Sequence, residues 1–225
     1  MKKLLLTAYG FSTDKIKRAA LGLLNIEHSS KACIISTSRP KEKEKHPQMQ
    51  QIRNDLLEFR LDQVDFLDVE FENANKLYDY DLIFFNWGYP FYLLHFLKKS
   101  GADYILKDIS RTGVPVFGLS AGSIVMGPSI EYLQYLYPED NQFNDTDLTG
   151  LNLTSTTIFP HFKEMLTRDA DIDKKLTSYE NTTGIKITRL NNDQALSCHC
   201  KNKVLISWIS NRKLYTLNND LISKS

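Results

Sequence analysis

The first half of the chain alternates short apolar runs with segments that have the apolar spacing of amphipathic helices. The apolar runs are typical of buried strands and cover residues 3–8, 32–37, 64–69, 81–86 and 114–119. Helices are predicted between them over residues 14–24, 48–61, 73–78, 91–99 and 102–111, and the charged stretch 39–47 is predicted to be an exposed loop. Strands that alternate with helices predict an α/β fold, with a mostly parallel sheet and helices on both of its faces.

The second half of the chain has a different pattern. Residues 132–150 mix aromatic with acidic and amide side chains, and we interpret them as an ordered loop over a site. A strand is predicted over residues 153–159 and an amphipathic helix over residues 164–176. Short β-like runs separated by Asn, Asp and Lys turns then predict antiparallel segments near the C-terminus, over residues 185–190, 195–200, 204–209 and 213–217.

Composition narrows the class of protein. Hydrophobic residues make up 42% of the 225 positions and charged residues 24%, which suits a globular chain. The net charge of +1 gives no electrostatic reason to expect a nucleic acid or an anionic membrane as partner. No apolar run approaches the roughly 18 residues of a spanning helix. Because no repeat or low-complexity linker interrupts the pattern, residues 1–225 are predicted to form a single domain, either a monomer or a homodimer.

The three cysteines, an odd and sparse number, favour a reducing compartment, and we expect a cytoplasmic protein. Cys198, His199 and Cys200 are the candidate metal ligands, but no second Cys/His cluster completes a set of four. We therefore expect neither a metal nor another cofactor.

The most informative stretch is Gly118-Leu119-Ser120-Ala121-Gly122, a G-x-S-x-G motif between a predicted central strand and a predicted helix. This context is typical of a nucleophile elbow, where a sharp turn presents a serine hydroxyl to a base. The first N–H groups of the following helix then point to where an oxyanion would form. The alternative is an ordinary glycine-rich turn.

A serine nucleophile needs a base, and His161 is the best placed of the five histidines, because it directly follows a predicted strand and a proline. The acid that would orient this histidine is harder to identify, and Asp193 is a candidate in a downstream turn. The N–H groups of Ala121 and Gly88 are the candidate oxyanion donors, since Gly88 follows the neighbouring strand.

These residues resemble those of the dipeptidase E and cyanophycinase-like serine peptidases, whose fold is similar to that of class I glutamine amidotransferases. The segment 118–123 resembles the family's G-x-S-A-G-A, residues 159–162 its N-P-H-F, and residues 88–94 its G-N-T-F-x-L-L. The resemblance implies a serine nucleophile at Ser120 and a histidine base at His161. It also implies a substrate-binding role for Arg168, for which the alternative is a solvent-facing helix arginine.

The chain departs from the family in three places. The G-G-G-N-T segment is Asn86-Trp87-Gly88-Tyr89-Pro90, and an aspartate beyond the elbow helix is replaced near Tyr135. The acid of the family falls at Asn192 by strict register and at Asp193 one position later. Loss of the orienting acid lowers turnover by roughly 10⁴-fold in a serine triad, so the choice between these two residues matters.

Three functions follow as expectations. The favoured one is a serine hydrolase of the dipeptidase E type that cleaves small peptides through a Ser–His–acid triad. The second is a catalytically weak or silent relative that binds a small ligand in the same cleft. The third is an esterase with an α/β-hydrolase fold, which would require the late histidine, His199, as its base.

Overall fold

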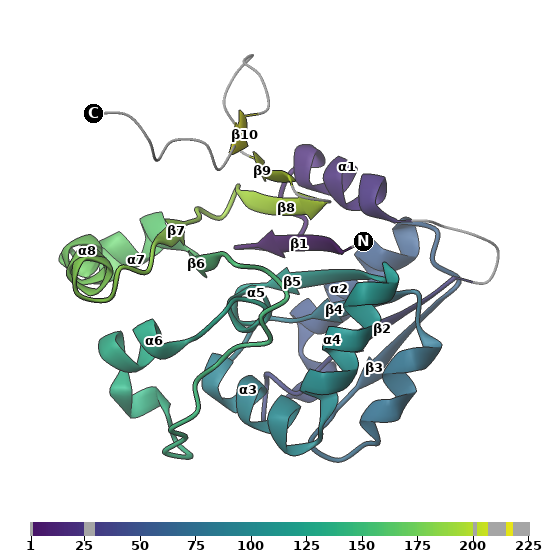
Figure 1. The fold of residues 1–225 in the computed structure, drawn as a ribbon. Coiled ribbons are helices and arrows are strands. Elements are labelled where there is room, and N and C mark those ends of the chain that lie inside the picture. The colour runs from purple at the N-terminus through teal and green to yellow at the C-terminus, as the bar shows by residue number, and fades with distance from the viewer. Residues whose placement is uncertain (1, 25–29, 200–201, 207–214, 218–225) are drawn as a thin grey trace.

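The computed structural model describes residues 2–24, 30–199, 202–206 and 215–217 (Figure 1). The predicted strand positions at Cys200, 207–209, 213 and 214 lie outside these ranges. An eight-stranded sheet runs through the centre, in the order β10-β9-β8-β1-β5-β4-β2-β3. Its strands are β1 (Lys3–Thr7), β2 (Lys31–Ile35), β3 (Gln63–Leu67), β4 (Leu82–Phe85), β5 (Pro115–Leu119), β8 (Ala195–His199), β9 (Asn202–Ile206) and β10 (Tyr215–Leu217).

The first five strands along the chain, β1 to β5, are parallel to one another, and β8, β9 and β10 extend the sheet beyond β1 as antiparallel strands. The predicted α/β fold, with a mostly parallel sheet and antiparallel strands near the C-terminus, is confirmed. β5 lies between β1 and β4, so the predicted elbow follows a central strand. In Figure 1 the carboxyl ends of the parallel strands point to the side where α6, α7 and α8 lie.

Helices cover both faces of the sheet. α1 (Asp14–Leu23) and α2 (Pro47–Glu58) pack on one face, and α3 (Pro90–Lys99), α4 (Ala102–Thr112) and α5 (Ala121–Val125) pack on the other (Figure 1). Each face has its own apolar core. The helix ends follow from local sequence: Thr13 accepts a hydrogen bond from the N–H of Ile16, and Gly113 ends α4 with φ 99°.

The exposed loop predicted over residues 39–47 and the short helix predicted over residues 73–78 both contain 3₁₀ turns, η1 (Lys43–Lys45) and η2 (Ala74–Asp79). The segment 132–150, predicted to be a loop, begins inside helix α6 (Glu131–Leu136), followed by η3 (Pro138–Asp140). No helix in the described ranges combines the length and the apolar character that crossing a membrane would require.

Two predictions for the second half are wrong in detail. The helix expected over residues 164–176 is two helices, α7 (Phe162–Arg168) and α8 (Ile172–Thr183). They are separated because the carboxylate of Asp169 accepts a hydrogen bond from the N–H of Asp171, which competes with the helical pattern. The run at 185–190 contains β7 (Ile187–Arg189), which pairs in parallel with β6 (Thr157–Phe159) in a separate small sheet instead of joining the antiparallel edge.

Candidate active site

Ser120 occupies a sharp turn between β5 and α5, as expected of a nucleophile elbow. Its φ of 51° and ψ of −109° are unusual for a residue with a side chain, and such a backbone stores about 1–3 kcal/mol of strain. The Ser120 N–H donates to the carbonyl of Thr7 at 3.0 Å, so the end of β1 holds the turn in place.

Buried hydroxyl groups fix the elbow from beneath. Thr7 is 1% exposed, and its hydroxyl donates to the carbonyl of Gly118 at 2.8 Å and accepts from the N–H of Gly10 at 3.0 Å. The Ser123 hydroxyl donates to the Thr7 carbonyl and accepts from the Thr7 N–H, both at 2.9 Å. Three of these four bonds connect β1 to Gly118 and Ser123, on either side of Ser120, so the strained backbone is held by buried contacts on each side.

Gly122 is required for the approach of α5 to β4. A Cβ atom at this position would lie 2.4 Å from the carbonyl oxygen of Phe85, which is closer than a carbon atom and an oxygen atom can approach without displacement. The second glycine of the motif therefore serves the packing of helix on strand rather than an unusual backbone angle.

His161 lies directly beside the serine. It follows β6 and Pro160, and its own φ of 59° turns the chain into α7. Its Nε2 is 2.9 Å from the Oγ of Ser120, and its Nδ1 is 2.7 Å from the Oδ1 of Asn192. Because an amide oxygen only accepts hydrogen bonds, Nδ1 carries the proton and Nε2 is free to accept from the serine hydroxyl.

Asn192, rather than Asp193, is the partner of His161. Asn192 lies in the turn after β7, and hydrogen bonds hold this turn in place. The backbone carbonyl of Asn192 accepts from the Ser12 hydroxyl at 2.7 Å, and the N–H of Asn191 donates to the side chain of Gln194 at 2.8 Å. The group that contacts the ring is therefore the neutral amide of Asn192, the position given by strict register with the family, and not the carboxylate of the candidate Asp193.

Gly88 follows β4 beside the elbow. Its φ of 146° is favourable for glycine and strained for a residue with a side chain. A Cβ atom at this position would also lie 2.1 Å from the carbonyl oxygen of Ser38. The flanking N–H groups are used, since Trp87 donates to the side chain of Asn86 at 2.8 Å and Tyr89 donates to the Ser38 carbonyl at 2.9 Å. No residue in the described ranges accepts a hydrogen bond from the N–H of Gly88.

Ala121 begins α5 and is 1% exposed. The first N–H groups of a helix have no partner within the helix, and the helix dipole favours negative charge in front of them. Ala121 and Gly88 thus place two backbone N–H groups after the carboxyl ends of two neighbouring strands, β5 and β4.

A cavity of about 240 Å³ opens beside the histidine. Its wall is formed by Tyr9, Gln48, Trp87, Leu119, His161, Glu164, Met165 and Arg168. The side chain of Arg168 is 67% exposed and forms an ion pair with Glu164. Arg168 is therefore near the predicted base, but its guanidinium is already paired within its own helix.

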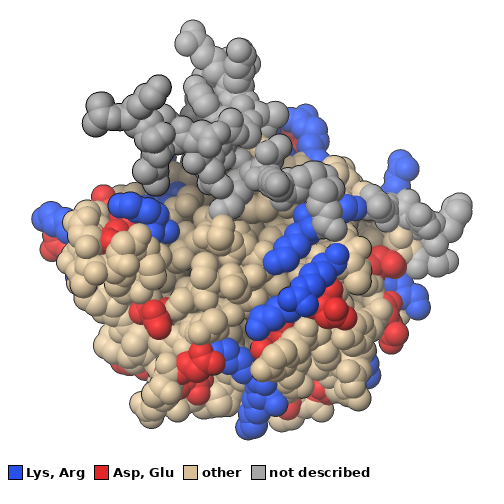
Figure 2. All heavy atoms as spheres, in the orientation of Figure 1, with Lys and Arg blue, Asp and Glu red and all other residues tan. Residues whose placement is uncertain are grey.

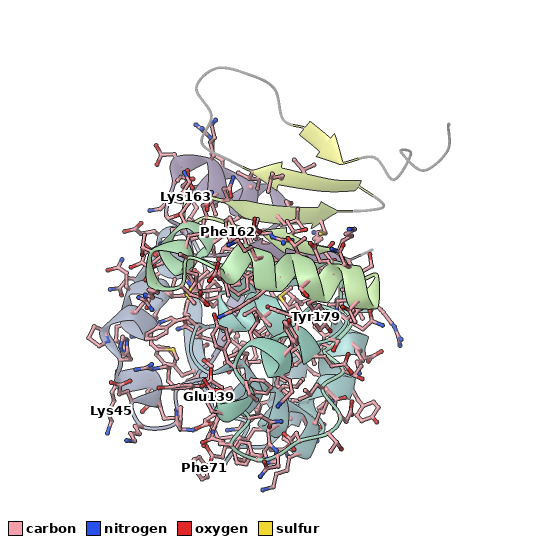
Figure 3. The ribbon with its side chains drawn as sticks, turned by 90° about the vertical axis from the view of Figure 1, so that its left-hand side faces the viewer. Lys45, Phe71, Glu139, Phe162, Lys163 and Tyr179 are labelled. Atoms are coloured by element: carbon pink, nitrogen blue, oxygen red, sulfur yellow. The ribbon has the colours of Figure 1, made fainter. Side chains whose placement is uncertain are left out.

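A second hollow, of about 480 Å³, is lined by residues of the loop after β2, by Tyr89 and by residues of the segment 132–150. The guanidinium of Arg39 stacks 4.2 Å above the Trp87 ring and lines this hollow together with Tyr89, Glu139 and Asp140. Burial raises the pKa of Asp140, and the neighbouring carboxylate of Glu139 acts in the same direction. Residues 132–150 contribute to this second hollow through Glu139, Asp140 and Gln142. Figure 3 shows Glu139 below Phe162 and Lys163, which lie at the start of α7.

The sequence profile of "Peptidase family S51" matches residues 16–206. The chain belongs to peptidase family S51. The dipeptidase E resemblance predicted from the sequence motifs is thereby confirmed.

Proteins of similar sequence are described as uncharacterized peptidases. The chain is 32% identical over 103 residues to uncharacterized peptidase Lmo0363 of Listeria monocytogenes, across 44% of this chain and 50% of that protein. It is 26% identical over 134 residues to uncharacterized peptidase PM1590 of Pasteurella multocida, across 60% and 63% of the two chains. The chain thus matches between half and about two thirds of the length of these relatives.

Solved structures share the fold. A Listeria monocytogenes EGD-e protein provisionally assigned as a peptidase E has a TM-score of 0.77 at 23% identity, covering 93% of this chain and all of that one. A peptidase from an acI-B1 actinobacterium has a TM-score of 0.71 at 16% identity, covering 92% and 88%. The S51 chain therefore has a peptidase E-like fold.

The geometry of the S51 chain does not support the esterase alternative. The backbone of His199 pairs with Lys3 at the amino end of β1, whereas Ser120 is bound to Thr7 at the carboxyl end. Five strand residues at about 3.3 Å each separate these two edges of the sheet. As for metals, the described ranges hold no cluster of three His, Cys, Asp or Glu side chains arranged to bind one, and Cys200 lies outside those ranges.

Sequence reasoning missed two residues of the site, Thr7 and Glu164. The role of Thr7 had no local signal, because its partners Gly118 and Ser123 lie more than 100 positions away. Glu164 had a weak one: it opens the helix predicted over residues 164–176 and follows the candidate base His161 by only three positions.

Proposed function

We propose that this chain is a serine peptidase of the dipeptidase E type that cleaves small peptides. The observation that carries the proposal is the 2.9 Å hydrogen bond between Ser120 Oγ and His161 Nε2 at a strained turn. A nucleophile and its base within hydrogen-bond reach, with the base held by a third group, are the parts needed for acyl transfer.

In the first half of the reaction, Oγ of Ser120 attacks the carbonyl carbon of the scissile bond while His161 Nε2 takes the hydroxyl proton. The oxygen of the tetrahedral intermediate accepts hydrogen bonds from the N–H groups of Ala121 and Gly88. Collapse of the intermediate breaks the C–N bond, and His161 delivers its proton to the leaving amine. Each oxyanion donor contributes about 10²–10³-fold and the general base about 10²–10⁴-fold to the rate.

In the second half, water attacks the acyl-serine. His161 Nε2 takes a proton from the water and returns one to Ser120 Oγ, which releases the carboxylate product. Asn192 holds the imidazole through Nδ1 during both steps. An asparagine fills this position in Cys–His–Asn proteases, so a neutral orienting group is compatible with catalysis.

The cavity beside His161 is the proposed binding site for the side chain of a small peptide. Its lining combines aromatic surface from Tyr9 and Trp87 with the guanidinium of Arg168. Arg168 would bind an acidic side chain of the substrate. To do so, the substrate carboxylate would compete with Glu164 for the guanidinium.

The neutral Asn192 also motivates a second candidate function, a silent relative that binds a small ligand in the same cleft. An amide orients the ring but does not neutralise the imidazolium that forms during attack. The two functions differ in whether Ser120 reacts, which a covalent probe measures directly.

The deciding experiment is labelling of the wild-type protein with a serine-directed fluorophosphonate, together with hydrolysis of a dipeptide panel. We expect labelling on Ser120 and loss of both labelling and hydrolysis in Ser120→Ala. Ser178→Ala, which removes a hydroxyl on α8, is the matched control and should label as the wild type does. Hydrolysis that persists in Ser120→Ala would overturn the nucleophile assignment, and an unlabelled wild type would favour the silent relative.

A further inference from the structure

A carboxylate lies directly behind the amide that holds His161. The Nδ2 of Asn192 donates to Oε2 of Glu164 at 3.4 Å, while Oδ1 of the same amide accepts from His161. The other oxygen of Glu164 is bound by Arg168. Ser120, His161, Asn192 and Glu164 therefore form one continuous chain of hydrogen bonds, which ends in an ion pair.

The orientation of the Asn192 amide decides which nitrogen of His161 carries the proton. With Oδ1 toward the ring, Nδ1 is protonated and Nε2 accepts from the serine. Turned by 180°, the amide would present its NH₂ group to Nδ1, which would then have to accept. The proton would move to Nε2, and the ring could no longer take a proton from Ser120.

Glu164, which contacts the other end of the Asn192 amide, selects between these two orientations. A carboxylate only accepts hydrogen bonds, so it binds the NH₂ end of Asn192 and rejects the oxygen end. Glu164 lies in the first turn of α7, three residues after His161, which immediately precedes the helix. The helix has no buried residue, so its polar side chains are free to serve the site. Its partner Arg168 keeps the carboxylate directed along the helix.

We propose that Glu164 is a positioning residue, which holds the Asn192 amide in the one orientation that leaves His161 competent as a base. The inference rests on the proposed serine peptidase function. It assigns to Glu164 the negative charge that the triad position itself lacks, one hydrogen bond farther from the ring.

The arrangement also explains why a neutral residue suits position 192. An aspartate there would place two carboxylates at about hydrogen-bond distance, and like charges at that separation disfavour double ionisation. Arg168 is the cation that faces this pair and offsets part of the repulsion. Asparagine at position 192 and glutamate at position 164 are thus a matched pair, and a change in either alters the effect of the other.

The test is a double-mutant cycle of Glu164→Gln and Asn192→Asp with two readouts. The first is kcat for the dipeptide hydrolysed best by the wild type. The second is the tautomer of His161 in the resting protein, from ¹⁵N chemical shifts assigned by comparison with His161→Ala. Glu58→Gln, which removes an exposed carboxylate at the end of α2, is the matched control.

We expect Glu164→Gln to lower kcat by about tenfold with little change in KM, because a hydrogen bond to a charged group contributes on that order. Glutamine can bind either end of the amide, so the His161 signals should shift toward a mixture of tautomers. In the Asn192→Asp background the same change should raise kcat, because it removes the repulsion. Glu58→Gln should leave both readouts unchanged.

The inference is overturned if Glu164→Gln keeps the wild-type tautomer, or if it lowers kcat equally in the wild-type and Asn192→Asp backgrounds. Failure of the proposed function has a different signature, a wild type that neither labels nor hydrolyses. The tautomer measurement needs no turnover, so it still decides the role of Glu164 in that case.

Discussion

The two halves of the candidate site are built in opposite ways. The serine half, Thr7 and Ser120–Ser123, is enclosed between β1, β4 and β5, and Ser123 is fully buried. The histidine half, His161, Glu164 and Asn192, lies on α7 and a turn, and α7 has no buried residue. Buried hydrogen bonds between hydroxyl groups and the backbone fix the serine half, whereas bonds between side chains near solvent fix the histidine half.

Because of this difference, substitutions in the two halves should affect folding and activity to different extents. A change in the serine half disturbs the packing of the central sheet and should reduce folding and activity together. A change in the histidine half touches polar groups at the surface and should reduce activity with little effect on folding. Figure 2 shows positive and negative groups scattered over the face it presents, so no single-sign field on that face orients a substrate from a distance.

The largest expected effect is on the chemistry of the histidine half. His161→Ala should lower kcat/KM by about 10⁴-fold, because it removes the general base while the oxyanion donors remain. Its thermal midpoint should stay within about 2 °C of the wild type, since the ring is half-buried and its bonds are polar. His199→Ala is the comparison variant and should retain activity. Equal losses in both variants would contradict the assignment of the base.

The largest expected effect on folding belongs to the serine half. Gly122→Ala should lower the free energy of unfolding by about 3 kcal/mol, because the added methyl group overlaps the backbone of Phe85. Activity should fall as well, since α5 must move away from Ser120. Urea denaturation and kcat measure the two effects.

Gly22→Ala is the matched glycine control, because nothing lies within 4 Å of its Cβ position on the exposed side of α1. It should stabilise the protein by about 0.5–1 kcal/mol. A Gly122→Ala variant as stable as the Gly22→Ala variant would contradict the tight packing of the elbow.

The smallest expected effect concerns an ion pair between α8 and β7, the strand that precedes the turn of Asn192. Arg189 on β7 donates to Glu180 on α8 at 2.7 Å, and the side chains are 20% and 10% exposed. Burial acts to raise the pKa of Glu180, but the hydrogen bonds from Arg189 and the Ile187 N–H outweigh it and hold the pKa below the usual value. The stabilisation from this lowered pKa is therefore present above about pH 4.5 and is lost as the pH falls below it.

Arg189→Met should lower the free energy of unfolding by about 2 kcal/mol at pH 7, because it leaves Glu180 with a buried charge. The difference from the wild type should shrink toward pH 4, where protonation removes that charge. Lys174→Met, at an ion pair whose side chains are 84% and 63% exposed, should leave the free energy of unfolding nearly unchanged, because solvent screens that pair. A pH-independent loss in Arg189→Met would contradict the electrostatic origin.

The sequence was most informative where the pattern is local. The strand that ends at Leu119, the turn at Ser120 and the helix that follows were visible in one short stretch, and so was the strand–proline–histidine sequence at His161. The broken helix at Asp169–Asp171 and the pairing of β7 with β6 were not predicted. A side-chain bond to a nearby N–H and a choice between two sheets both depend on competition that periodicity does not record.

The sequence by itself determined the α/β fold and the elbow, and it predicted the serine and the histidine that the structure brings within hydrogen-bond distance, because hydrophobic period and turn chemistry act over a few residues. Only the tertiary structure decided that Asn192 rather than Asp193 meets the ring, that Thr7 supports the elbow and that Glu164 lies behind the amide. These contacts join residues separated along the chain by helices and strands whose packing sets their distances to within an ångström, a precision that no local pattern carries.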